Sequence, residues 1–120
     1  MALHESAEMY IETIYVLSQQ TPYVRSVDIA EHMGYSKPSV SRAVGLLKQK
    51  GYVVADEAGY LLLTEEGLAV ARKIFERHTV LSNFLISLGV SPEAASEDAC
   101  KIEHVISDET LGAIKRHMDQ

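Results

Sequence analysis

A cysteine, a glutamate and a histidine near the end of the chain have the spacing of a metal-binding face. Cys100, Glu103 and His104 stand at positions i, i+3 and i+4, and such positions share one side of a helix, with Cβ atoms about 5–6 Å apart. Thiolate, carboxylate and imidazole groups are common ligands of transition-metal ions. The alternative is a buried cysteine beside a surface Glu–His pair, and the spacing alone does not decide between the two.

Three further side chains have ligand chemistry. Met9 and Glu12 stand three residues apart in a predicted first helix, and His78 stands among apolar positions of a long predicted helix, where a bare imidazole needs a polar partner. The ordinary interpretations are a core methionine, a solvent-exposed glutamate and a core histidine bonded to a carbonyl group. Together with the first three residues, however, they favour a metal site.

A basic segment has the pattern of a DNA-reading helix. Residues 36–50 contain basic side chains and no acidic one, in a chain of net charge −6. Short polar and basic groups near a helix N-terminus suit contacts with phosphate and base edges. The predicted DNA-binding residues are Ser36, Lys37, Pro38, Ser39, Ser41 and Arg42. Among them, Arg42 is the candidate for a guanine contact and Lys37 for a phosphate contact; the alternative is a solvated basic helix in a protein-interaction module.

The elements that position these residues follow from apolar periodicity and capping residues. We expect helices at residues 5–19, 26–32, 36–50, 65–88, 92–106 and 108–118, with a β-hairpin of residues 52–55 and 60–63. The predicted N-caps are Ser26, Ser36, Thr64 and Ser107. Helix, tight turn, helix and hairpin is the order of a winged helix-turn-helix. The predicted fold is therefore mainly α with a small β-hairpin wing: a winged helix-turn-helix DNA-binding domain at 1–64 and a helical dimerisation and metal-binding domain at 65–120.

The composition is that of an ordinary globular protein. Hydrophobic residues make up 47% and charged residues 23% of 120 residues. No apolar run approaches the roughly 18 residues that a membrane span needs, and the acidic N-terminal residues are unlike a signal peptide. With a single cysteine there is no intrachain disulfide, so we expect a cytoplasmic protein with no membrane partner.

The residues above stand in stretches that resemble the diphtheria-toxin-repressor/manganese-transport-regulator (DtxR/MntR) family. The matching stretches run in family order over roughly residues 5–112: residues 8–12 with 14–15, 28–31, 37–41, 63–64 with 67, 77–78, and 102–104 followed by 107. No stretch is specific alone, but the set is.

The resemblance implies homodimers that bind palindromic operators when they are loaded with metal. The residues that match the main metal site of iron-type members are Met9, Cys100, Glu103 and His104. Glu12 and His78 match ligands of the second metal in manganese-type members, so the ligand set is a hybrid. Ser82 and Ser96 stand where iron-type members have ancillary ligands. By its length the chain resembles the manganese-type members, which lack a third, SH3-like domain.

We therefore expect a metal-activated, DNA-binding transcriptional repressor that controls iron or manganese homeostasis genes and binds a palindromic double-stranded DNA operator as a homodimer. Sulfur ligands favour ions softer than Mn²⁺, so Fe²⁺ is favoured over Mn²⁺, with Co²⁺, Ni²⁺ or Zn²⁺ as substitutes in vitro. The apolar residues expected in the dimer surface are Leu81, Phe84, Leu85, Leu111 and Ile114.

Three alternatives remain open: a metal-independent winged-helix regulator, a metalloenzyme and a dimeric protein-interaction module. We expect no enzyme, because the sequence has no Ser-His-Asp set, no phosphate-cradling glycine loop and no HExxH motif. No small organic ligand is expected.

Overall fold

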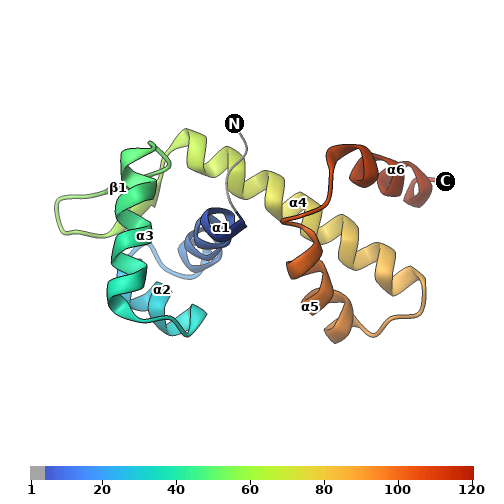
Figure 1. Cartoon of the computed structure of the whole chain (residues 1–120), viewed down its shortest axis with the longest axis horizontal. Coiled ribbons are helices and arrows are strands. Elements are labelled where there is room, and N and C mark those ends of the chain that lie inside the picture. The colour runs from blue at the N-terminus through green and yellow to red at the C-terminus, as the bar shows by residue number, and fades with distance from the viewer. Residues whose placement is uncertain (1–4) are drawn as a thin grey trace. The chain divides into compact units, whose positions relative to one another are not determined.

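The computed structural model describes residues 5–120, with side chains from residue 6 onward. The elements of this part of the chain are α1 (Glu5–Gln20), α2 (Ser26–Met33), α3 (Lys37–Gln49), β1 (Val53–Ala55), β2 (Leu61–Leu63), α4 (Glu65–Ser87), α5 (Pro92–Ile102) and α6 (Asp108–Met118) (Figure 1). A mainly helical fold with a winged helix-turn-helix is confirmed. The chain divides within α4 into two compact units, up to Arg72 and from Lys73 to Gln120. The functional boundary between residues 64 and 65 stays a prediction.

The first unit packs α1, α2, α3 and the hairpin around one apolar core. Its buried residues are Tyr10, Ile11, Ile14, Val24, Ile29, Ala30, Val40, Val44, Leu47, Val53, Leu61 and Ala71. The two strands pair antiparallel, with Val53 opposite Leu63 and Ala55 opposite Leu61. The helical spacing of the buried residues on α1 and α3 is the periodicity from which these helices were predicted.

The turns of the helix-turn-helix are fixed by local chemistry. Gly34 has a φ of 73° between α2 and α3, a conformation that glycine adopts without steric cost. Ser36 caps α3, because its side-chain oxygen accepts a hydrogen bond from the backbone N–H of Ser39 at 3.3 Å. The predicted caps at Ser36, Thr64 and Ser107 are confirmed by such side-chain bonds.

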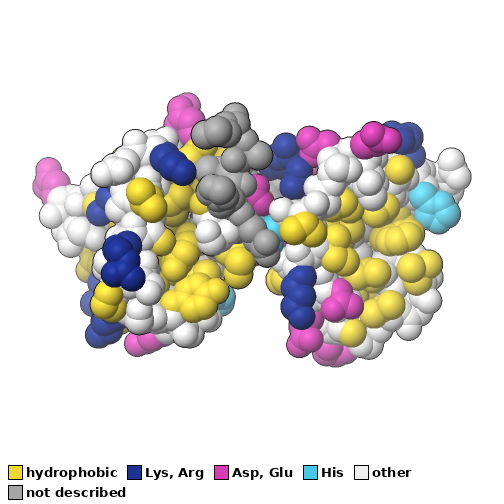
Figure 2. Space-filling view, in the orientation of Figure 1, with side chains coloured by type: hydrophobic (Ala, Val, Ile, Leu, Met, Phe, Trp, Pro, Cys, Tyr) yellow, Lys and Arg dark blue, Asp and Glu magenta, His cyan; other side chains and the backbone are white. Residues whose placement is uncertain are grey.

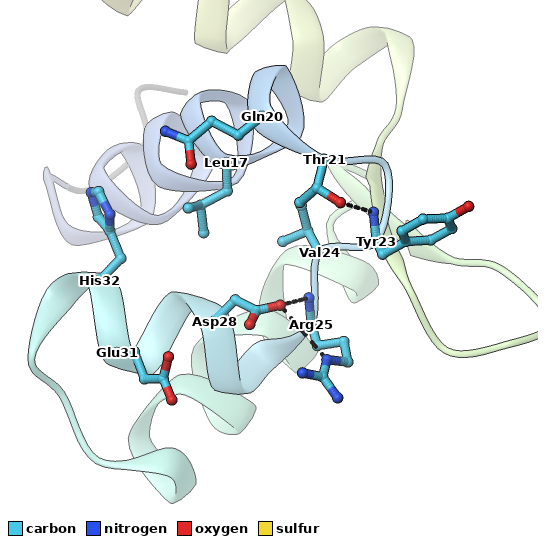
Figure 3. Close-up of a pocket in the computed structure, with 9 residues that line it drawn as sticks. All are labelled: Leu17, Gln20, Thr21, Tyr23, Val24, Arg25, Asp28, Glu31 and His32. Atoms are coloured by element: carbon cyan, nitrogen blue, oxygen red, sulfur yellow. Dashed lines mark hydrogen bonds and ion pairs between the residues drawn. The ribbon is translucent and has the colours of Figure 1, made fainter.

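The predicted cap at Ser26 is wrong, because Ser26 is the first residue of helix α2 and the N-cap residue stands one position before it. Arg25 is the N-cap residue, and its backbone N–H donates to a carboxylate oxygen of Asp28 at 2.9 Å. The Arg25 Nε atom lies 3.7 Å from the same oxygen. Figure 3 shows this arrangement at the edge of an open cleft of about 490 Å³ beside α2. The Asp28 carboxylate therefore stabilises the start of α2 by accepting a hydrogen bond from the N–H of its N-cap residue.

The second unit has a smaller core between the end of α4 and the helices α5 and α6. Leu81, Ala99 and Leu111 are buried there, with Ile102, Ile106 and Ile114 packed against them. Leu81 and Leu111 thus belong to the core of the unit, which corrects their predicted place in a dimer surface. Apolar side chains that stay exposed in this unit are Phe75, Ile86, Leu88 and Val105, and Figure 2 shows hydrophobic side chains over the face of the unit.

Gly67, in the first turn of α4, lies against the chain that enters the hairpin. A Cβ atom on Gly67 would lie 2.1 Å from the backbone oxygen of Tyr52, which also accepts a hydrogen bond from the Thr64 N–H. We predict that Gly67→Ala lowers the free energy of unfolding by roughly 1–3 kcal/mol, because α4 must move away from the hairpin. Urea unfolding followed by circular dichroism measures this.

The matched control is Gly45→Ala in the middle of α3, where no atom other than the local backbone of the helix and the two neighbouring residues lies within 4 Å of the added Cβ. This change should raise the free energy of unfolding by about 0.5–1 kcal/mol, since alanine restricts the unfolded chain and favours the helix. An equal gain in stability for Gly67→Ala would show that the close approach does not constrain the fold.

Candidate metal centre and nucleic-acid interface

Three side chains with ligand chemistry meet inside the second unit. His78 comes from α4, Cys100 from the last turn of α5, and Glu103 from the residue after α5. The Nδ1 atom of His78 lies 2.9 Å from Oε2 of Glu103 and 3.8 Å from Sγ of Cys100. Glu103 has no exposed surface, whereas the Cys100 residue is exposed. The cluster therefore joins a buried carboxyl group to the surface.

The donor set of this cluster fits a divalent transition metal ion. One atom from each of His78, Cys100 and Glu103 can be chosen so that all lie within 4.8 Å of one another. Bond lengths of about 2.0–2.3 Å keep two ligands of one ion within roughly 4.6 Å of each other, so small side-chain movements would suffice. Imidazole and thiolate suit Fe²⁺, Co²⁺ or Zn²⁺, while the carboxylate also suits Mn²⁺.

Glu103 keeps the predicted i, i+3 relation to Cys100, because its backbone is still helical and its N–H donates to the Ala99 oxygen, whereas His104 follows in a turn. Helix α5 ends at Ile102, and residues 103–105 form a turn. The turn still brings the two residues together, because Nε2 of His104 lies 3.4 Å from Oε1 of Glu103. The side chain of His104 is only 2% exposed. Glu103 therefore meets Cys100 through helical spacing, and His104 meets Glu103 through the turn.

A long-range contact explains where α5 stops. Arg77, next to His78 on α4, donates from Nη1 to the backbone oxygen of Glu103 at 3.1 Å. Its Nη2 atom donates to Oδ1 of Asp108, the first residue of α6, at 2.6 Å. A guanidinium fork that binds both groups holds the chain in a turn between the two helices. Sequence reasoning gave Arg77 and Asp108 no role, although an arginine directly before the candidate ligand His78 was an available signal.

Met9 and Glu12 lie on α1 in the first unit, three residues apart and both half-buried. The backbone oxygen of Met9 accepts a hydrogen bond from Thr13 Oγ1 at 2.9 Å, as expected within a helix. Their participation in the metal centre stays a prediction. In the second unit, Ser96 Oγ lies 3.5 Å from Nε2 of His78, so this serine stands at the edge of the cluster.

The start of α3 exposes the predicted DNA-binding face. Five of its six predicted residues are exposed, namely Ser36, Lys37, Pro38, Ser41 and Arg42. Ser39 is half-buried, and its hydroxyl accepts a hydrogen bond from Ser36 Oγ at 2.8 Å. The opposite side of α3 is anchored in the core. Figure 2 shows basic side chains over the edge of the first unit where Figure 1 draws α3.

Both units match the two halves of one known family. The model of the iron dependent repressor N-terminal DNA binding domain matches residues 2–61, and that of its metal binding and dimerisation domain matches residues 64–120. The transcriptional regulator MntR of Escherichia coli O6:H1 is 38% identical over 111 residues, which cover 92% of this chain and 72% of the relative. An HTH-type transcriptional regulator of Methanocaldococcus jannaschii is 32% identical and covers 98% of this chain and 96% of its own.

Solved structures agree with this assignment. The manganese regulator SloR superposes with a TM-score of 0.82 at 28% identity, covering 99% of this chain and 55% of its own. A manganese-dependent transcriptional repressor in complex with manganese gives a TM-score of 0.87 at 26% identity, covering 94% of this chain and 52% of its own. The chain thus spans about half the length of these structures.

The chain belongs to the DtxR/MntR family of metal-dependent transcriptional regulators. Its relatives bear the names of transcriptional regulators and not of enzymes. None of the helices in the described part of the chain is long and apolar enough to cross a membrane.

The contact between Arg77 and Asp108 makes the stability of the second unit depend on pH. The hydrogen bond from Arg77, and then the charges of Lys73 and Arg77, lower the pKa of the Asp108 carboxyl below its ordinary value of 3.8. A lowered pKa in the folded state contributes stability above the unfolded-state value, and this contribution is lost as the pH falls through the folded-state pKa.

We predict that Asp108→Asn destabilises the protein at pH 7, and that its difference from the wild type shrinks below pH 3.8 and then disappears. Urea unfolding at a series of pH values measures both. Asp119→Asn, at the far end of α6, is the control; it should not destabilise, because a negative charge there opposes the helix dipole. A difference for Asp108→Asn that is constant with pH would contradict the predicted role of its charge.

Proposed function

We propose that the chain is a metal-activated repressor that binds a palindromic DNA operator as a homodimer and controls genes of iron or manganese homeostasis. The observation that carries the proposal is the cluster of His78, Cys100 and Glu103, which stands in the same chain as an exposed polar and basic helix start at α3. A regulator needs both a site that responds to a signal and a surface that reads DNA, and these two features supply them.

The metal centre is proposed to use His78, Cys100, Glu103 and His104, with Met9 and Glu12 as further ligands on the strength of the family resemblance. A bound divalent ion would supply positive charge beside the buried carboxyl group of Glu103. The ligands determine which metal ion is preferred. Cys100 offers a soft donor atom, while Glu103 and His104 are held at the turn after α5. An ion that binds the DNA-competent state better by ~1–3 kcal/mol changes operator affinity by about 5–150-fold.

Fe²⁺ is the first candidate for the activating ion, because a thiolate ligand favours ions softer than Mn²⁺. Mn²⁺ is the second candidate, and a specific observation favours it. The relatives include regulators named MntR and structures titled manganese regulator and manganese-dependent repressor. The two ions therefore have to be compared directly.

The DNA interface is proposed to be the N-terminal half of α3, lying in the major groove. Arg42 would contact a base edge, since its fork fits the O6 and N7 atoms of guanine, and Lys37 would bind phosphate. The wing has a different role. The Asp56 carboxylate accepts hydrogen bonds from the backbone N–H groups of Ala58 and Tyr60 at 3.0 and 2.9 Å, so this acid shapes the hairpin turn, and the acidic tip avoids deep phosphate contact.

We predict that operator affinity rises at least about tenfold with the activating ion relative to chelator, and that His78→Ala abolishes this rise. Fluorescence anisotropy on DNA from the protein's own promoter region, under anaerobic conditions with chelator, Fe²⁺ or Mn²⁺, measures it. Cys100→Asp should move the preference from Fe²⁺ toward Mn²⁺, because it replaces a soft donor with a hard one.

The matched control for His78→Ala is Thr79→Ala, an exposed neighbour on α4 whose hydroxyl bonds to the backbone oxygen of Phe75. It should keep the full response to metal. If affinity is the same with chelator and with each ion, a metal-independent winged-helix regulator becomes the better account. An unchanged Fe²⁺/Mn²⁺ ratio in Cys100→Asp would show that the thiol is not a ligand.

We predict that Arg42→Ala weakens operator binding by about 1–3 kcal/mol and relaxes the preference at one base pair. Lys37→Ala should instead weaken binding to every sequence alike. It should also lower the slope of log affinity against log salt concentration by about the amount that one phosphate contact contributes. Anisotropy with operator and scrambled DNA at several salt concentrations distinguishes the two. Lys101→Ala on α5 removes a basic residue from the second unit and should leave operator affinity and its salt dependence unchanged. An equal loss of affinity in this control would contradict the assignment of α3 as the DNA interface.

A further inference from the structure

Arg77 joins the end of α5 to the start of α6. Its two terminal nitrogens donate separately, one to the backbone oxygen of Glu103 at 3.1 Å and the other to Oδ1 of Asp108 at 2.6 Å. The Arg77 side chain is only 11% exposed, whereas the Asp108 side chain is 70% exposed. The guanidinium is therefore largely buried. Its two acceptors stand at the two ends of the connection between α5 and α6, residues 103–107, which is called the 103–107 turn.

The backbone oxygen of Glu103 needs such a partner. Carbonyl groups at the end of a helix have no intrahelical donor, and this one belongs to a residue with no exposed surface. The N–H of Ile106 still donates to the oxygen of Ile102 with helical spacing, but Ser107, whose N–H would be the next helical donor, has an extended backbone and caps α6. Arg77 satisfies the carbonyl group in place of the next turn of helix.

The same residue, Glu103, is held at its side chain by the next residue of α4. His78 Nδ1 lies 2.9 Å from Oε2 of Glu103, while Arg77 binds the main chain of Glu103. Two consecutive residues of one helix thus fix the peptide and the carboxyl group of a single candidate ligand. Groups that orient metal ligands without touching the ion tune affinity strongly, since their loss lets the ligands move.

We propose that Arg77 is a positioning residue of the metal centre: by bonding the Glu103 carbonyl and Asp108 at once, it holds the 103–107 turn in the conformation in which Glu103 and His104 can bind a divalent cation. The inference rests on the proposed function, because it assumes that this cluster binds metal. It adds a residue outside the predicted ligand set and states how that residue acts.

The sign of the effect separates positioning from simple electrostatics. A guanidinium cation near the site repels a metal ion, so if charge alone mattered, Arg77→Met would tighten metal binding. If positioning dominates, Arg77→Met weakens it. Arg77→Lys keeps the charge but lacks the planar fork that reaches two acceptors, so it too should bind metal more weakly than the wild type. Lys73 contacts Asp108 at 3.6 Å from the same helix, which makes Lys73→Met the matched control.

The test uses the full chain and Co²⁺ as the probe. Anaerobic titration followed by the sulfur-to-cobalt absorption band gives the dissociation constant and reports ligation by Cys100. Amide hydrogen exchange of residues 103–107 in the metal-free protein gives a second readout that does not depend on metal. We expect Arg77→Lys and Arg77→Met to weaken Co²⁺ binding by about 10–100-fold and to speed exchange in the turn, while Lys73→Met changes neither.

Tighter or unchanged Co²⁺ binding in Arg77→Met would overturn the inference and leave the metal centre standing. A wild-type protein that binds no Co²⁺ by equilibrium dialysis would remove the proposed metal centre, and the inference with it, whereas bound Co²⁺ without the sulfur band would remove only Cys100 from the ligand set. If both Arg77 variants fail to fold by circular dichroism, Asp108→Asn decides, because it keeps Arg77 and weakens only one of its anchors. Faster exchange in the turn and weaker Co²⁺ binding in this variant support the inference, and wild-type values for both overturn it.

Discussion

A buried carboxyl group is the constraint on which the second unit depends. Glu103 has no exposed surface, and a polar group without water must find partners inside the protein. His78 supplies one at Oε2 and His104 stands 3.4 Å from Oε1, while Arg77 binds the carbonyl of the same residue. These partners come from α4 and from the turn after α5, so their positions fix how those segments meet. Imidazoles are also common ligands of metal ions, so the proposed metal centre uses the same side chains that satisfy the buried carboxyl group.

The proposed function of the first unit depends on the side chains that lie outside its apolar core. Val40, Val44 and Leu47 anchor one side of α3 among apolar side chains. The anchored side sets the rotation of the helix, and Ser41 and Arg42 are left in solvent. The Ser36 cap and Gly34 turn then decide where the helix begins. A polar helix start with free N–H groups attracts phosphate, so the apolar pattern of α3 and its capping together specify the proposed DNA-reading surface.

Local patterns predicted most of the fold, and they failed where distant residues decide. The limits of α3 followed from Ser36, Pro38 and Gly51, whose effects act within a few residues. The extension of α5 to residue 106 was wrong because Arg77, more than twenty residues earlier in the chain, takes the carbonyl of Glu103. For the same reason the cluster of His78, Cys100 and Glu103 was predicted by residue type, whereas its geometry and the role of Arg77 were not. At Ser26 the error was local, since Asp28 offered a competing acceptor for the N-cap amide.

The ligand types of the proposed centre do not by themselves explain how it would select one metal ion over another. Affinity for most nitrogen, oxygen and sulfur sites rises from Mn²⁺ to Cu²⁺ regardless of the protein, so a regulator that responds to Fe²⁺ or Mn²⁺ has to discriminate by geometry. A thiol on the exposed end of α5 can adjust to several ions. Glu103 cannot do so as easily, because its carbonyl and its carboxyl group are held by consecutive residues of α4. The rigid member of the cluster, more than its softest member, is therefore where discrimination between ions would arise.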